Sequence, residues 1–327
     1  YLVEEVKTIY LGGGTPSILS NDEIELIFNT IYNHYNVSNN VEITLEANPD
    51  DLTYDKIQFF KSTPINRFSI GVQSFFDTDL QFMNRTHNAK EAIKSIENVK
   101  KSGFENITID LIYGIPGSEN WKANLERFFD LGILHLSSYA LTVEGKTALE
   151  YLIKTKKIDP VDDVQQEREY NQLIESIYKK GFEQYEISNF TKNEKYSIHN
   201  TNYWKFKPYL GVGPSAHSFD GETRQWNRAN NTHYIKALQN GTLPSEKEVL
   251  TLQDQFNEKV MIGLRTKWGI DLGEIRSLGN GLEEKLFTVS KVYIDENKLI
   301  NKNGFLILNP KYRFFADRIA SDLFMTE

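Results

Sequence analysis

The first 190 or so residues alternate short apolar, β-branched runs with segments of helical periodicity. Short apolar runs of this kind are typical of buried strands, and apolar residues spaced three and four apart predict helices. The predicted strands are 6–11, 41–46, 67–72, 107–112, 134–141 and 182–187, and the predicted helices include 24–31, 89–99, 121–131 and 164–180. Strand starts separated by roughly 25–40 residues favour βα units that build a parallel sheet.

The pattern changes beyond about residue 240, where helical periodicity predominates. Residues 256–264, 271–278, 282–292 and 312–324 read as helices, and residues 299–308 as a hairpin that turns at Asn303-Gly304. The sequence therefore predicts two domains. Residues 1–235 would form an α/β domain, an incomplete parallel (β/α) barrel, and residues 241–327 a smaller, mainly helical domain with a hairpin.

The residues that could carry chemistry occur at or near the ends of the predicted strands. They are Gly12-Gly13-Gly14-Thr15, Glu46, Gln73, Asp110, and Tyr139 with Ala140. In a barrel of βα units these ends converge on one mouth, which holds the active site. A glycine loop between strand and helix suits a carboxylate, an ammonium or a phosphate, although a plain tight turn is the alternative. Arg85, predicted on a short helix after Gln73, could pair with a ligand carboxylate there.

Composition limits the chemistry that this chain can perform. The 327 residues include no cysteine, which excludes disulfides, thiolate metal sites and cysteine nucleophiles. The net charge of −8 argues against nucleic-acid binding. Helices followed by a hairpin resemble a winged helix, but residues 241–327 hold 12 basic and 13 acidic residues and so lack a basic face. The absence of a long apolar run and of a signal peptide indicates a cytoplasmic protein.

Several motifs, taken in order, identify a family. They are GGGTPS at 12–17, LEANP at 45–49, SIGVQSF at 69–75, NR at 84–85, IDLIYGIPG at 109–117 and SYAL at 138–141. This series resembles radical SAM proteins of the oxygen-independent coproporphyrinogen oxidase group and implies a barrel of the radical SAM type. The run HNTNYW at 199–204, followed by YLGVGPSAHS at 209–218, is similar to the signature of the HemW-type haem chaperones in that group.

The resemblance implies roles for individual residues. Gly13, Gly14 and Thr15 would hold the amino and carboxylate groups of S-adenosylmethionine. Four further residues would contact the same cofactor, its ribose or a second cofactor molecule: Glu46, Gln73, Arg85 and Asp110. Ala140 is assigned to the same group of cofactor-binding residues. His199 would be an axial ligand to haem iron, with Tyr203 and Trp204 shaping an apolar wall beside it. His217 is the second candidate, and the alternative for His199 is a turn cap. No catalytic residue is assigned.

The chain departs from the family pattern at one point. Members carry a CxxxCxxC loop whose thiolates hold a [4Fe–4S] cluster, and this sequence contains no cysteine. The expectation is that the unit bearing that loop is missing from this chain, and that only a full-length protein binds the cluster.

Three functions are compatible with these residues. The resemblance favours a haem chaperone that binds haem and S-adenosylmethionine and delivers haem to respiratory haem proteins, and it leaves peripheral membrane association and a homodimer open. The alternative is a radical SAM coproporphyrinogen III oxidase, which catalyses an oxidative decarboxylation in porphyrin biosynthesis. Without the resemblance, the glycine loop indicates a barrel enzyme that binds a phosphorylated or zwitterionic metabolite.

Overall fold

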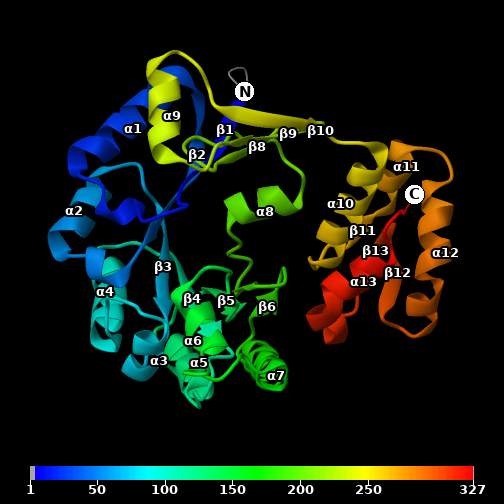
Figure 1. The fold of residues 1–327 in the computed structure, drawn as a ribbon, viewed down its shortest axis with the longest axis horizontal. Helices are drawn as coiled ribbons and strands as arrows, with labels where there is room; N and C mark the ends of the chain where they lie inside the picture. The colour runs from blue at the N-terminus through cyan, green and yellow to red at the C-terminus, as the bar shows by residue number, and fades with distance from the viewer. Residues whose placement is uncertain (1–3, 327) are drawn as a thin grey trace. The chain divides into compact units, whose positions relative to one another are not determined.

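The computed structural model describes residues 4–326, so the first residues of the predicted N-terminal domain lie outside the described part. The chain divides into two compact units between His199 and Asn200. Each unit has its own strands and helices (Figure 1). The sequence pattern placed the change of architecture between residues 235 and 241, whereas residues 200–235 group with the second unit in space.

The first unit is a curved sheet with helices packed along it. Its strands are β1 (Glu5–Leu11), β2 (Asn36–Ala47), β3 (Arg67–Gln73), β4 (Asn106–Tyr113), β5 (His135–Ala140), β6 (Glu183–Gln184) and β7 (Asn189–Thr191). Its helices are α1 (Asn21–His34), α2 (Tyr54–Ser62), α3 (Asp77–Phe82), α4 (Ala89–Lys101), α5 (Trp121–Asp130), α6 (Ala148–Lys154) and α7 (Asp163–Lys179). The strand order is β1-β2-β3-β4-β5-β7-β6, and β1 to β5 are parallel. The prediction of an α/β fold with an incomplete parallel barrel is confirmed.

The sixth predicted strand is wrong in its extent and in its place beside β5, although β6 does run in the direction of β5. Residues 182–187 contain only the two-residue strand β6, and the chain then returns as β7, antiparallel to both β6 and β5. A parallel neighbour requires a crossover of a dozen or more residues. Only residues 185–188 join β6 to β7, so this connection is too short for anything but an antiparallel pair.

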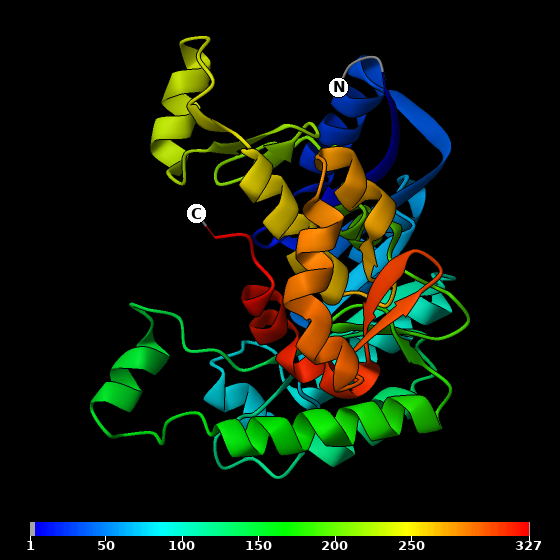
Figure 2. The ribbon, with the colours of Figure 1, turned by 90° about the vertical axis from the view of Figure 1, so that its right-hand side faces the viewer.

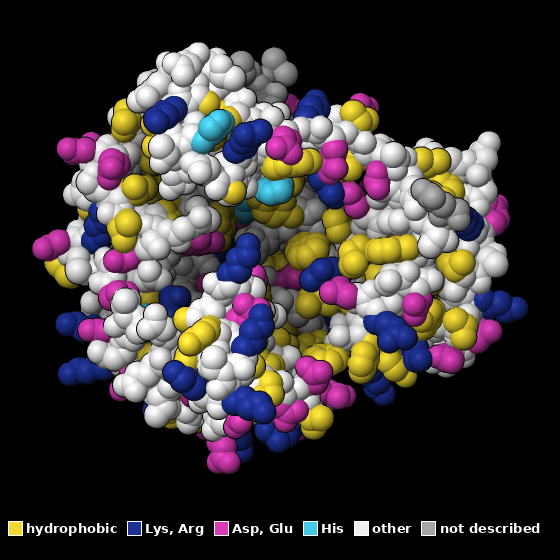
Figure 3. All heavy atoms as spheres, viewed as in Figure 1, with side chains coloured by type: hydrophobic (Ala, Val, Ile, Leu, Met, Phe, Trp, Pro, Cys, Tyr) yellow, Lys and Arg dark blue, Asp and Glu magenta, His cyan; other side chains and the backbone are white. Residues whose placement is uncertain are grey.

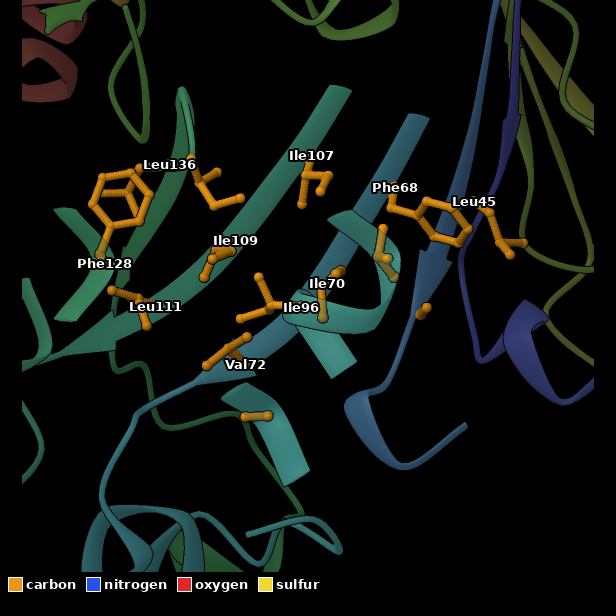
Figure 4. Packing of buried hydrophobic residues seen from close by; sticks show 14 of the residues in the cluster. Leu45, Phe68, Ile70, Val72, Ile96, Ile107, Ile109, Leu111, Phe128 and Leu136 are labelled. Carbon is orange, nitrogen blue, oxygen red and sulfur yellow. The ribbon is translucent and has the colours of Figure 1, made fainter. Parts of the chain in front are cut away.

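The two faces of the sheet differ in chemistry because side chains alternate along each strand. The outer face carries apolar residues such as Leu45, Phe68, Ile70, Ile109 and Leu111, which pack against Ile96 of α4 and Phe128 of α5 in one core (Figure 4). The inner face carries polar and charged side chains. They are Thr8, Tyr10, Glu42, Thr44, Glu46, Arg67, Ser69, Thr108, Asp110, His135 and Ser137.

Local sequence signals set where several helices begin. The Ser20 side chain accepts from the Glu23 N–H, and the Glu23 carboxylate accepts from the Ser20 N–H, so α1 starts with the predicted capping box. Asn88 and Glu91 start α4 in the same way. The following Gly103 has a φ of 93°, a conformation that favours glycine after a helix. In contrast, every residue of α6 is at least partly exposed, and the helix lies at the tip of long loops (Figure 2).

The second unit combines two small antiparallel sheets with helices. α8 (Ile198–Trp204) leads into it, and the other helices are α9 (Asn231–Gln239), α10 (Leu252–Leu264), α11 (Leu272–Leu278), α12 (Leu282–Asp295) and α13 (Ala316–Asp322). The strands are β8 (His217–Phe219), β9 (Thr223–Asn227), β10 (Ser245–Val249), β11 (Ile270–Asp271), β12 (Leu299–Lys302) and β13 (Phe305–Leu308). They form the sheets β10-β9-β8 and β11-β13-β12.

The predicted hairpin at 299–308 is confirmed. Asn303 and Gly304 both have positive φ, as a two-residue turn of this kind requires. The predicted helix at 312–324 instead begins as a 3₁₀ turn over Pro310–Phe315 and becomes α-helical only at Ala316. Within residues 4–326, every helix is too short or too polar to cross a membrane. Basic and acidic side chains are interspersed over most of the face drawn in Figure 3.

Candidate functional site

A polar cavity of about 220 Å³ opens where β2, β3 and β4 of the first unit end. Its lining residues are Gly14, Thr15, Glu46, Ala47, Asn48, Ser69, Gly71, Gln73, Arg85 and Asp110. Small-molecule pockets are typically ~300 Å³ or larger. The cavity therefore has room for one end of a ligand of metabolite size rather than for the whole of it.

The glycine loop brings the backbone close to a carboxylate. Gly13 has a φ of 75°, and its N–H donates to Glu46 Oε2 at 3.1 Å. A Cβ added to Gly12 would lie 2.4 Å from Tyr10 Cε1 and 2.8 Å from Glu46 Cδ, whereas one on Gly14 would meet open space. Gly12 is thus required for the packing of Tyr10 and Glu46, and Gly14 keeps the cavity wall free of side chains.

Gln73 and Arg85 reach the cavity over a second glycine. Gln73 is not a glycine yet has a φ of 65°, a strained conformation that clusters at functional sites. A Cβ on Gly71 would lie 3.0 Å from Gln73 Nε2 and 3.4 Å from Arg85 Nη2. Arg85 follows the end of α3 rather than lying on it, and its Nη2 donates to Asn48 Oδ1 at 2.9 Å and to the Gly71 carbonyl at 3.3 Å.

Two carboxylates and one guanidinium therefore face the same cavity. Burial, followed by the negative charge of Glu46, raises the pKa of Asp110 to about 7. Ser69 Oγ donates to Asp110 Oδ1 at 3.4 Å. A cationic group bound beside Glu46 and Asp110 would relieve their repulsion, while Arg85 can take a carboxylate. The lining suits a zwitterionic ligand with additional positive charge.

Deeper on the inner face, a buried ion pair holds the start of α8. Arg67 Nε lies 3.7 Å from Glu42 Oε2, and both side chains are at most 3 % exposed. The Glu42 carboxylate accepts from the Ile198 N–H at 3.1 Å and from the His199 N–H at 2.8 Å. Carboxylates at a helix N-terminus are favourable because the first N–H groups lack helical partners. Glu42 thereby fixes the backbone from which His199 projects.

The His199 ring is held by two residues of β1. Its Nδ1 lies 2.9 Å from Thr8 Oγ1, and the ring stacks on Tyr10 with centroids 4.7 Å apart. Burial, with a smaller effect of the Arg67 charge, lowers the pKa of His199 to about 4. The ring is therefore neutral at pH 7, the state in which imidazole binds metals. This pKa is lower than the ordinary value of about 6.5 expected from the sequence.

The remaining predicted haem residues belong to the second unit. Tyr203 packs edge-on against Tyr209 with centroids 4.6 Å apart, and the Arg265 guanidinium lies 5.7 Å from the centre of the Trp204 ring. His217 is exposed on β8 and lies near Trp226. His135, which the sequence indicated as a core histidine, is buried between Thr108 and Tyr185.

The structure brings most of the predicted cofactor residues together. One cavity is lined by Gly14, Thr15, Glu46, Gln73, Arg85 and Asp110. Gly13 donates a hydrogen bond from its N–H to the Glu46 carboxylate in the cavity wall. Ala140 is different, because its side chain packs against the hydrophobic core of the outer face. Sequence reasoning missed Tyr10, Ser69 and Glu42. The alternation along β1, β2 and β3 was the available signal, since it places these three residues on the inner face.

Comparison with known proteins first defines the class. The family model of the Radical SAM superfamily matches residues 1–133. The solved structure of the coproporphyrinogen III oxidase HemN from Escherichia coli superposes with a TM-score of 0.83 at 18 % identity, covering 98 % of this chain and 78 % of that one. At this identity the likeness shows a shared fold.

Relatives at higher identity define the family. The haem chaperone HemW of Lactococcus lactis is 34 % identical over 91 % of this chain and 79 % of its own length. HemW of Bacillus subtilis is 34 % identical over 96 % of this chain and 84 % of its own length. This chain belongs to the HemW family of radical SAM proteins, and the resemblance seen in its motifs is confirmed.

The close approach at Gly12 predicts different outcomes for two neighbouring glycines. Gly12→Ala forces Tyr10 or Glu46 out of place, so the free energy of unfolding of the first unit should fall by about 1–3 kcal/mol. Gly14→Ala has room for its Cβ and should change that free energy by less than about 1 kcal/mol. Chemical denaturation followed by circular dichroism measures both. Equal effects of the two substitutions would contradict the packing described for Tyr10 and Glu46.

The raised pKa of Asp110 predicts a pH-dependent stability. The folded state binds more protons than the unfolded state between about pH 4 and 7, so the contribution of Asp110 to stability is lost as pH rises through 7. Asp110→Asn removes this titration. Its free energy of unfolding relative to wild type should therefore rise by about 4 kcal/mol from pH 4 to pH 8, because each unit of pKa shift corresponds to about 1.4 kcal/mol. Asp159→Asn in an exposed loop is the matched control, and a flat difference for Asp110→Asn would show an ordinary pKa.

Proposed function

We propose that this chain acts as a haem chaperone, which binds haem iron through His199, binds S-adenosylmethionine in the strand-end cavity and delivers haem to respiratory haem proteins. The observation that carries the proposal is the neutral His199 imidazole. It lies in the HNTNYW run and is held on the inner face by Glu42, Thr8 and Tyr10. The relatives that bear the name haem chaperone support the same reading.

His199 fits the needs of a haem ligand in charge and in orientation. A protonated imidazole cannot bind iron, and a pKa of about 4 keeps His199 neutral at any physiological pH. Its Nδ1 forms a hydrogen bond with Thr8 Oγ1, and such a bond to one ring nitrogen usually fixes the ring orientation of a histidine that binds metal. Tyr203 and Trp204 follow on the same helix, α8, and their role as an apolar wall beside the haem stays a prediction.

The cavity fits the amino-acid end of S-adenosylmethionine. That end carries an ammonium and a carboxylate beside a sulfonium, so it is a zwitterion with extra positive charge. Glu46 and Asp110 would hold the ammonium, and Arg85 would pair with the carboxylate. Gly14 leaves space for the ligand to approach the backbone. When bound in radical SAM proteins with their cluster, this cofactor supplies radical chemistry.

The residues of this chain do not fit an iron–sulfur cluster. The sequence has no cysteine, and thiolates are the usual ligands of such clusters. Among residues 4–326, no group of three or more histidine, aspartate or glutamate side chains is arranged to hold a metal ion. We therefore assign this chain binding roles and derive no radical step from it. A cytoplasmic location, peripheral membrane contact and a homodimer stay predictions.

Glu46→Gln tests the cofactor site. The substitution keeps the shape of the side chain but removes its charge, so the affinity for S-adenosylmethionine should fall about 10- to 150-fold, the effect of a hydrogen bond to a charged group. Isothermal titration calorimetry measures the dissociation constant. Glu144→Gln, in an exposed loop of the same unit, serves as the control and should bind as the wild type does. If a folded Glu46→Gln protein binds S-adenosylmethionine with unchanged affinity, the cavity is not the binding site of this cofactor.

His199→Ala tests the haem site. We expect at least a tenfold loss of haem affinity and an altered Soret band, while circular dichroism shows a folded protein. His217→Ala should retain both affinity and spectrum. If His199→Ala binds haem as the wild type does and His217→Ala does not, His217 is the ligand. Formation of protoporphyrinogen by the anaerobically reconstituted protein would instead support the oxidase.

A further inference from the structure

Tyr10 contacts both proposed sites of the first unit at once. Its hydroxyl donates to Glu46 Oε1 at 2.6 Å, and Glu46 lines the cofactor cavity. The Tyr10 ring stacks on the His199 imidazole, with the two ring centroids 4.7 Å apart and 23° between the ring planes. One side chain therefore touches a residue of each proposed ligand site.

The surroundings leave the phenol little freedom. Tyr10 lies near the end of β1 on the inner face, and Gly12 is needed to make room for its ring edge. The two Glu46 oxygens are held separately, Oε1 by the Tyr10 hydroxyl and Oε2 by the Gly13 N–H. Burial and the adjacent Glu46 raise the pKa of Tyr10, so the hydroxyl keeps its proton and remains a donor. A movement of the Glu46 carboxylate must therefore be followed by the Tyr10 ring.

We propose that Tyr10 is a positioning residue that couples the two sites, so that each ligand tightens the binding of the other. The inference rests on the proposed function, because it takes Glu46 and His199 as contacts of the two ligands. A cation bound at Glu46 orders that carboxylate, and the ordered carboxylate holds Tyr10 and the His199 ring stacked on it. A ring already held in place loses less freedom on binding iron. Linkage requires the effect to be reciprocal.

Tyr10→Phe separates the two contacts, because it removes the hydroxyl and keeps the ring. Haem affinity is measured by absorption titration with and without saturating S-adenosylmethionine, and cofactor affinity is measured with and without haem. In the wild type we expect each ligand to raise the affinity for the other by about fivefold or more. In Tyr10→Phe both ratios should fall to one, although each ligand still binds. Tyr54→Phe, 65 % exposed on α2, should keep the wild-type ratios.

The outcomes distinguish this inference from the function on which it rests. A wild type that binds both ligands independently overturns the coupling and leaves the proposed function intact. A wild type that fails to bind either ligand overturns both. Tyr10→Phe that retains the wild-type ratios shows a merely structural tyrosine and overturns the inference.

A second measurement on the unmodified protein covers the case in which Tyr10→Phe does not fold. The ring signals of His199 in a ¹³C-histidine-labelled sample, assigned by their loss in His199→Ala, should shift when S-adenosylmethionine is added. No shift at saturation overturns the coupling.

Discussion

One buried ion pair on the inner face of the sheet fixes the backbone at His199, and the Arg67 charge within it also opposes the rise in the pKa of Asp110 in the cavity. Arg67 and Glu42 are almost completely inaccessible, and the charge of each is compensated by the other. Removing one partner of such a pair typically costs about 3–5 kcal/mol, because the other charge stays buried. Glu42 also accepts the first N–H groups of α8. The ion pair thus fixes the position of the start of α8, because Glu42 holds residues 198–199 against a strand more than 150 positions earlier in the sequence.

The strict alternation of the strands allows one sheet to serve two purposes. The outer face supplies the hydrophobic core, with Phe68, Ile70 and Ile109 fully buried against helices. The inner face can then hold Tyr10, Glu46 and Asp110, which a core could not accept. Parallel strands bring their carboxyl ends to one edge, so polar residues at or before the ends of β2, β3 and β4 meet in a cavity. Two local consequences follow from that convergence: Gln73 has a positive φ, and Gly12 has no room for a side chain beside Tyr10 and Glu46.

Much of the fold and of the cavity could be predicted from the sequence. Five parallel strands and the Asn303-Gly304 hairpin follow from local patterns, and Glu46 and Asp110 follow from the rule that functional residues lie at strand ends. The β6–β7 pair could not be predicted, because residues 182–187 read as one strand and the antiparallel return of β7 depends on the short connection at 185–188. The low pKa of His199 could not be predicted either. It arises from burial and from Arg67, which is distant in the sequence. The alternation along β1 and β2 could place Tyr10 and Glu42 on the inner face, but not their non-local contacts with Glu46 and His199.

The proposed haem site requires a His199 ring that is neutral at physiological pH. A pH titration of the His199 ring signals by NMR, in the protein without haem, measures its protonation. We expect the ring to stay unprotonated from pH 8 down to pH 5, with a midpoint near pH 4. A midpoint near the ordinary value of about 6.5 would show a solvated imidazole and would overturn this role of the buried His199 ring.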